Sequence, residues 1–320
     1  MKKVLIIITF ILSGILLLGC NDRNMSHDIY VTVYPLQYVA EEILEGTEYT
    51  VGIVPGVTSH ESSVDWSPRE IIAMTEATYL FYIGANYDYY IDYQIDSIFS
   101  NKLVELVKIQ DSGYIEFIPG EIHEHDHDDE HTHDAHATNT SALGIDPHFW
   151  ISPIKILEVA ELVYDKLIEA YPEEETLLSD NYDNLLLTLQ ELSDDYQEAI
   201  DKLTNIVLTS TNLYGYLRND YGLNFMPIST GYHEESDQFT LEQKQKIVAE
   251  ADFHDIQYII YEKYTTSPLS DAVREELSMG KLEFNILQSI LDEEVNAGKN
   301  YVTIMYDNLE LIKTAGEYEG

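Results

Sequence analysis

The stretch that decides the fold is "LLSDNYDNLLLTLQELSDDYQEAIDKLTN", residues 177–205. Its apolar side chains recur every three or four residues, the spacing of one face of an α-helix. They are Leu177, Leu178, Tyr182, Leu185, Leu186, Leu189, Leu192, Tyr196 and Ile200. We predict one helix over residues 173–205. A helix of about 30 residues measures roughly 45 Å, which is longer than a small domain is wide. Such a helix is either a coiled-coil arm or a rigid connection between two lobes, and the flanking sequence favours the connection.

The sequence before this helix alternates between strand-like and helix-like patterns. Strands are predicted at residues 28–34, 49–55, 79–84 and 103–109, and helices at residues 35–46, 67–77, 90–100 and 152–170. Ser67 is a typical helix N-cap, with Pro68 in the first turn and Glu70 at the capping-box position. The βαβαβαβ order predicts a mostly parallel sheet with helices on both faces.

The sequence after the long helix repeats this alternation. Strands are predicted at residues 205–210, 223–229, 256–262 and 282–287, and helices at residues 212–222, 240–252, 267–279 and 301–314. We therefore predict an α/β protein of two lobes, over residues 28–172 and 206–320, joined by the helix of residues 173–205. Ligands of such open sheets lie beyond the carboxyl ends of the strands, so we expect a binding cleft between the lobes.

Residues 1–20 have the pattern of a bacterial export signal. Met1-Lys2-Lys3 is basic, and the apolar run Val4–Leu18 is shorter than the roughly 20 residues that a spanning helix needs. The following "LLGC" resembles a lipobox, so we expect lipidation of Cys20, the single cysteine, and a polar tether over residues 21–27. The alternative is a plain signal peptide with an unrelated cysteine. The expected location is the outer face of the cytoplasmic membrane or the periplasm.

The formal net charge of −41 is extreme. It argues against nucleic acid as a partner, because phosphate binding needs basic patches. An acidic surface attracts cations, yet solubility alone explains most of the acidic residues.

The segment "EIHEHDHDDEHTHDAH", residues 121–136, alternates histidines with acids. It lies in a stretch, residues 120–143, that has no helical or strand period and is predicted to be a mobile loop. Because ordering such a loop costs entropy, we expect loose, auxiliary metal binding by its histidines. These are His123, His125, His127, His131, His133 and His136. A solvated acidic spacer is the alternative.

His60 and His148 lie where a specific metal site is expected. Each occupies a short loop at a strand or helix boundary that prolines stiffen, and a zinc ligand must be held with its imidazole neutral and oriented. Two loop histidines alone are a weak indication, because a lone histidine is more often a surface or core residue.

Four segments add a resemblance. "VPGVTSHESSVDWSPRE", "DPHFWISP", "LYGYLRNDYGL" and "AGKNYVTIMYDNLELI" resemble, in order, the zinc-uptake solute-binding lipoproteins of ABC transporters. The resemblance implies two α/β lobes that clamp one transition metal and deliver it to a membrane permease. It also implies that His60 and His148 are the first two ligands. Zn²⁺ is the expected ion and Mn²⁺ the less favoured one, because nitrogen ligands suit zinc.

The chain departs from the family pattern at the other two ligand positions. Thr211 stands where the family has a histidine or glutamate, and Gln288 where it has an acid. Both are neutral, weak ligands for zinc. Glu61, beside His60, and His233, in the loop "STGYHEESDQF", are possible substitutes.

Enzymatic motifs are absent from the sequence: it has no phosphate-binding glycine loop, no Gly-x-Ser-x-Gly, no HExxH and no cysteine nucleophile. We therefore expect a binding protein and not an enzyme. The leading interpretation is a zinc receptor that feeds an ABC permease. The alternative is a surface adhesin or metal-buffering paralogue, which the altered positions Thr211 and Gln288 would favour.

Overall fold

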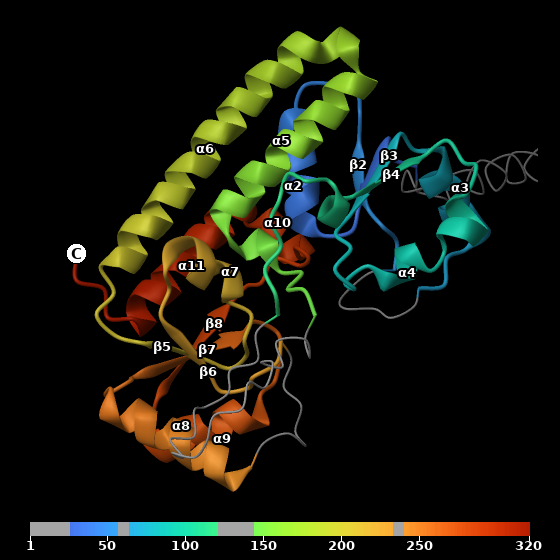
Figure 1. The fold of residues 1–320 in the computed structure, drawn as a ribbon. Coiled ribbons are helices and arrows are strands. Elements are labelled where there is room, and N and C mark those ends of the chain that lie inside the picture. The colour runs from blue at the N-terminus through green and yellow to red at the C-terminus, as the bar shows by residue number, and fades with distance from the viewer. Residues whose placement is uncertain (1–25, 57–63, 121–143, 233–239) are drawn as a thin grey trace, which may run out of the picture.

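A computed structural model describes residues 26–56, 64–120, 144–232 and 240–320, and these contain two four-stranded parallel sheets (Figure 1). The first has the order β2-β1-β3-β4, formed by β1 Ile29–Val31, β2 Val51–Ile53, β3 Tyr79–Tyr82 and β4 Glu105–Lys108. The second has the order β6-β5-β7-β8, formed by β5 Val207–Thr209, β6 Phe225–Pro227, β7 Tyr258–Glu262 and β8 Gly280–Phe284. The predicted two-lobed α/β fold is confirmed.

Both sheets are wound in the same way. The strand order changes direction between β1 and β3 in the first sheet, and between β5 and β7 in the second. In open parallel sheets, ligands bind beyond the carboxyl ends of the strands at such a switch point. The loops that follow β1, β3, β5 and β7 are therefore the places to look for a site.

The helices of the first lobe follow the predicted pattern with one exception. They are α2 Tyr34–Ile43, α3 Pro68–Glu76, α4 Tyr89–Asp92 and α5 Pro153–Ala170. The capping box of α3 is confirmed, because the Glu70 amide donates to Ser67 Oγ and the Ser67 amide donates to the Glu70 carboxylate. The prediction of a single helix over residues 90–100 is wrong, because this segment contains two short elements. It is divided into α4 and a π-helical turn, Ile95–Phe99, and the Gln94 side chain between them donates to the Tyr90 carbonyl.

The second lobe contains α7 Gly215–Tyr221, α8 Leu241–Phe253, α9 Pro268–Leu277, α10 Asp292–Asn296 and α11 Tyr301–Ala315. The short helix α10 was not predicted. Its five residues are too few for a periodic pattern, although three acids in its first turn favour a helix start.

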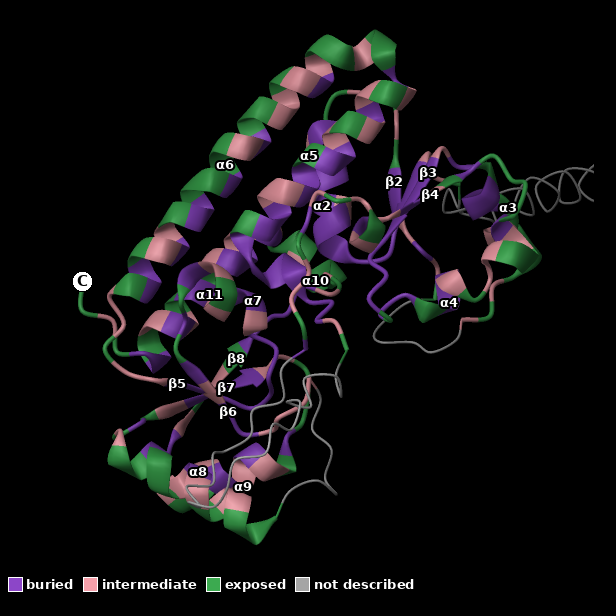
Figure 2. Cartoon of the chain, viewed as in Figure 1, coloured by how far each residue is buried: buried purple, intermediate pink, exposed green. Residues whose placement is uncertain are grey.

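The long helix is α6, Glu175–Asp201, with 27 residues. Its buried face includes Leu178, Leu185, Leu189, Leu192 and Tyr196. Figure 2 shows this buried stripe along α6, which runs beside α5 and also contacts α2 and α11. Since α2 belongs to the first lobe and α11 to the second, α6 is packed against both and is not a free arm.

Buried hydrogen bonds also join the lobes. Trp150 is fully buried, and its Nε1 donates to the Ile286 carbonyl at 2.8 Å. The Tyr301 hydroxyl donates to the Trp150 carbonyl at 2.9 Å. One continuous apolar core contains side chains from both sheets, so the lobes share their interior.

The amino-terminal residues 1–25, with Cys20, lie outside the described residues. Among the helices that the structure does describe, none combines the length and apolar character needed to cross a membrane.

The packing of α6 generates a stability prediction. Leu189→Ala deletes a fully buried side chain at the lobe junction and should lower the free energy of unfolding by about 2–5 kcal/mol. Leu187→Ala on the same helix is the matched control, because Leu187 is 72% exposed and its loss should cost less than about 0.5 kcal/mol. Chemical denaturation of both variants measures the difference, and equal losses would contradict the assigned buried face.

Candidate metal site

Among the candidate ligands that the structure describes, His148 is the most deeply buried. His148 is 1% exposed and immediately precedes the 3₁₀ turn Phe149–Ile151 that leads into α5. Its Nδ1 lies 2.8 Å from Oδ1 of Asp146, and its backbone amide donates to the same oxygen at 2.9 Å. Because an ionised carboxylate only accepts hydrogen bonds, this contact favours the neutral tautomer with the proton on Nδ1, in which Nε2 has a lone pair for a metal ion. This carboxylate–histidine pair is the usual second-sphere arrangement of a metal-binding imidazole.

Helix α7 holds Asp146 in place. The Tyr216 hydroxyl donates to the Asp146 carbonyl at 2.9 Å, and a Cβ at Gly215 would lie 2.9 Å from Asp146 Oδ2. The glycine therefore permits the close approach of α7 to the carboxylate. On the other side, the Asp146 amide donates to the Ile118 carbonyl at 3.0 Å.

Three aromatic rings from both lobes surround His148. The ring centroids of Tyr232, Trp150 and Tyr87 lie 4.9, 5.3 and 6.3 Å from that of the imidazole. Tyr87 follows β3, and Tyr232 follows β6, so the carboxyl ends of the two sheets meet at His148. The rings exclude water from the imidazole and strengthen its electrostatic interactions.

A buried carboxylate shapes the loop that presents Tyr87. Asp88 accepts hydrogen bonds from the amides of Ile83 and Gly84, and burial raises its pKa to about 7. Ala85 and Asn86 adopt left-handed backbone conformations, with φ of 51° and 60°, in the same turn. Burial also raises the pKa of the Tyr87 hydroxyl well above its usual value, so that hydroxyl is neutral.

Thr211 and Gln288 lie at the carboxyl ends of the second sheet. Thr211 follows β5, is 5% exposed, and its Oγ1 is buried without a hydrogen-bond partner. Gln288 follows β8, and its buried Nε2 faces the Tyr87 hydroxyl. The backbone carbonyl of Gln288 accepts a hydrogen bond from the backbone amide of Tyr34 at 3.2 Å. This bond attaches the turn after β8 to the first lobe. Unpaired buried polar atoms mark a place where a missing ligand would complete the bonding.

Glu262, the last residue of β7, was not predicted from the sequence. Its carboxylate is close enough to His148 for the two to interact electrostatically. It also helps to raise the pKa values of the nearby Tyr87 and Tyr214 hydroxyls. Burial raises the pKa of Glu262 to about 7, and the His148 interaction opposes that rise.

Several predicted residues lie outside the described part of the chain: His60, Glu61, His233 and the six histidines of residues 121–136. His233 directly follows Tyr232, whose ring contacts His148. The two ends of segment 121–143 are held together by the Pro119–Ile145 bridge, close to Asp146. Within the described residues, no three His, Cys, Asp or Glu side chains form a metal-binding group. A complete metal site at His148 would therefore include a residue outside the described part of the chain, and the predicted role of His60 is consistent with this.

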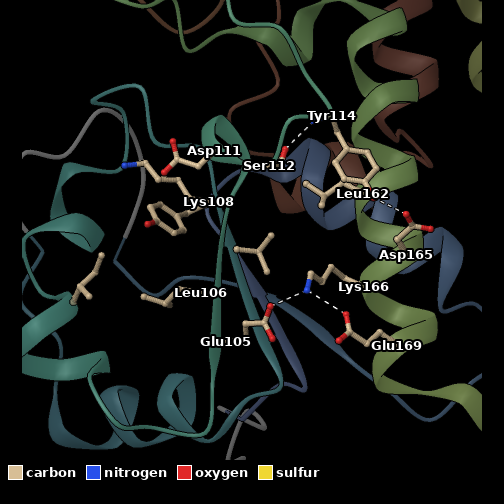
Figure 3. A pocket seen from close by; sticks show the side chains of 13 residues that line it. Glu105, Leu106, Lys108, Asp111, Ser112, Tyr114, Leu162, Asp165, Lys166 and Glu169 are labelled. Carbon is tan, nitrogen blue, oxygen red and sulfur yellow. Dashed lines mark hydrogen bonds and ion pairs between the residues drawn. The ribbon is translucent and has the colours of Figure 1, made fainter.

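Away from His148, an open groove lies between β4 and α5 (Figure 3). Several of its charged groups are paired. Lys166 bridges Glu105 and Glu169 at 2.8 and 3.2 Å, and the Tyr114 hydroxyl donates to Asp165 at 2.6 Å. Carboxylates that already hold a lysine or a hydroxyl group are less available to a metal ion, so we do not assign a site there.

Sequence reasoning missed Asp146, Glu262 and the two tyrosines. "DPH" does contain a signal for Asp146, because an Asp two residues before a histidine can bond back to its amide in an Asx-type turn. Glu262 gives no comparable signal, since only the strand order brings the end of β7 toward residue 148.

Comparisons with known proteins identify the relatives of this chain. A family model described as zinc-uptake complex component A, periplasmic (ZnuA), matches residues 29–315. The zinc-binding protein AdcA of Streptococcus pyogenes is 25% identical over 297 residues, covering 91% of this chain and 56% of the relative. The high-affinity zinc uptake system protein ZnuA of Bacillus subtilis is 24% identical, covering 92% of this chain and 89% of the relative.

The fold is shared with a solved relative. The zinc(II)-bound ZnuA-like domain of Streptococcus pneumoniae AdcA superposes with a TM-score of 0.70 at 22% identity, over 91% of this chain and 99% of that domain. The chain spans little more than half the length of the S. pyogenes AdcA protein that it matches. The family model, which accounts for nearly all of the described residues, shows that the chain belongs to the ZnuA family of zinc-uptake components.

Proposed function

We propose that this protein is an extracytoplasmic receptor that captures one zinc ion at the junction of its lobes and delivers it to an ABC permease. The observation that carries the proposal is the buried His148–Asp146 pair. It presents one imidazole nitrogen as a lone-pair donor among loops from both lobes. His60 is proposed as the second imidazole ligand, and Thr211, Gln288, Glu61 and His233 are candidates for the remaining positions.

The family supports both the cargo and the delivery. Relatives of this chain are named for zinc binding and zinc uptake, and the family model describes a component of a zinc-uptake complex. Imidazole ligands favour Zn²⁺ over Mn²⁺, which prefers oxygen. We further propose that Cys20 is lipidated and tethers the protein to the outer face of the cytoplasmic membrane. A Streptococcus pneumoniae relative is named a zinc-binding lipoprotein.

The adhesin or buffer alternative is less well supported. This alternative is based on the neutral residues Thr211 and Gln288. The structure nevertheless contains the buried His148–Asp146 pair. A protein that only buffered metal through residues 121–136 would need no buried, oriented imidazole.

The central test is zinc affinity, measured by competition with a chromophoric chelator. The full chain should bind one ion tightly, and His148→Ala should weaken that binding by more than about 100-fold, because a direct ligand is lost. His254→Ala is the matched control. His254 lies at the end of α8, where its Nε2 is 3.7 Å from Glu250, and its loss should leave the affinity unchanged. Equal affinities for the two variants would refute the site.

Asp146→Asn tests how the imidazole is oriented. The amide group can donate a hydrogen bond to Nδ1, which favours the tautomer that places the proton on Nε2, the nitrogen needed for the ion. We expect zinc affinity to fall by roughly 10- to 100-fold, as for other second-sphere partners. Asp165→Asn, at an exposed partner of Tyr114, is the control. An unchanged affinity in Asp146→Asn would exclude this orienting role.

Deleting residues 121–143 distinguishes the receptor proposal from the metal-buffer alternative. Their flanks already pair through Pro119 and Ile145, so a short linker should preserve the fold. The receptor proposal expects equilibrium dialysis to show loss of weakly held zinc and retention of the tight ion. Loss of all zinc binding would favour the buffer instead.

A further inference from the structure

The ligands inherited from the family pattern leave a charge unbalanced. Imidazoles are neutral when they bind metal, and the Thr211 hydroxyl and the Gln288 amide are neutral as well. A divalent ion that such a set holds in a buried place would keep its full charge, which is costly in a low-dielectric environment. A site of this kind needs at least one nearby anion.

Glu262 has the required location. It ends β7, and Thr211 lies two residues beyond β5, so the two residues flank the switch point of the second sheet. Along β7, side chains alternate between two cores. Ile260 belongs to the core shared by the lobes, and Glu262 lies on that same face, since strand residues two apart point the same way. The carboxylate lies near groups from both lobes there, namely His148, Tyr87 and Tyr214.

The Glu262 carboxylate also lacks a partner among the described residues. No ion pair or hydrogen bond to it is formed within them, and the adjacent Lys263 is committed to Glu294 at 2.8 Å. Other carboxylates near this edge are paired, as Asp146 is with His148 and Glu294 with Lys263. A partly buried, uncompensated anion beside a buried imidazole is an arrangement that a divalent cation would complete.

We propose that Glu262 is a direct ligand of the captured divalent cation and supplies the negative charge that Thr211 and Gln288 do not. The inference rests on the proposed function, because it assumes that the ion binds at His148. It assigns the acidic ligand to the end of β7 in place of the turn after β8. Zinc accepts carboxylate oxygen together with imidazole nitrogen, so the resulting ligand set is chemically ordinary.

The test compares Glu262→Gln with Glu283→Gln in the full chain. Both variants remove one negative charge from the second sheet, but Glu283 is exposed on β8 and pairs with Lys281 at 2.9 Å. Zinc affinity is measured by chelator competition, and the ligand set by the visible absorption of the Co²⁺-substituted protein. We expect Glu262→Gln to weaken zinc binding by more than about 100-fold, beyond the range of a second-sphere partner, and to change the Co²⁺ spectrum. Glu283→Gln should change neither.

The outcomes separate this inference from the proposed function. A loss of less than about 10-fold in Glu262→Gln with an unaltered Co²⁺ spectrum, while His148→Ala still abolishes binding, would overturn the role of Glu262 and leave the receptor standing. No tight zinc binding by the unmodified chain would overturn both. The melting temperature of metal-free Glu262→Gln guards against misfolding. It should equal or exceed that of the unmodified chain, because the variant removes an uncompensated charge.

Discussion

The structure depends on the burial of Trp150 between the lobes. Its indole nitrogen and its carbonyl are both bonded to the second lobe, at Ile286 and Tyr301. Breaking either bond would leave a buried polar group without a partner, at a cost of about 1–3 kcal/mol. The segment of residues 146–152 is therefore fixed to both lobes, and His148 receives its orientation from this attachment. The long helix α6 reinforces it by packing against elements of each lobe.

This rigidity would suit the role of metal ligand that we propose for His148, although it lies in a loop. Loops at strand ends are usually mobile, but the loop of His148 is held by α7 through Asp146 and by the ring of Tyr232. The imidazole is thus oriented before any ion arrives, so binding does not have to order it. Preorganisation of this kind reduces the entropy lost on binding.

The elements of the fold were largely predictable, for identifiable reasons. Helices α3 and α5 begin at Ser-Pro pairs, α6 has regular apolar spacing, and the alternation of strands and helices indicates parallel sheets. The break near residues 93–94, where the Gln94 side chain bonds to the Tyr90 carbonyl, has no counterpart in the apolar spacing of the sequence.

The candidate site was predictable only in part. His148 stands out through its proline-rich loop and the family resemblance. The packing around it depends on strand order and on contacts between distant segments, which no local pattern encodes. Tyr87 and Glu262 come from loops and strands of different lobes, and only folding brings them to the same imidazole. The roles of His60 and His233 remain predictions, since these residues lie outside the described part of the chain.

The continuous core has a consequence for communication with a transporter. In many binding proteins the two halves close about a hinge when the ligand binds, and this change of shape distinguishes the bound form from the empty one. Two halves that share one interior cannot separate without exposing it to solvent. In a receptor of this construction, empty and filled forms would present nearly the same outline. A permease would have to distinguish them through the few surface loops next to the ion, or through how long each form stays docked.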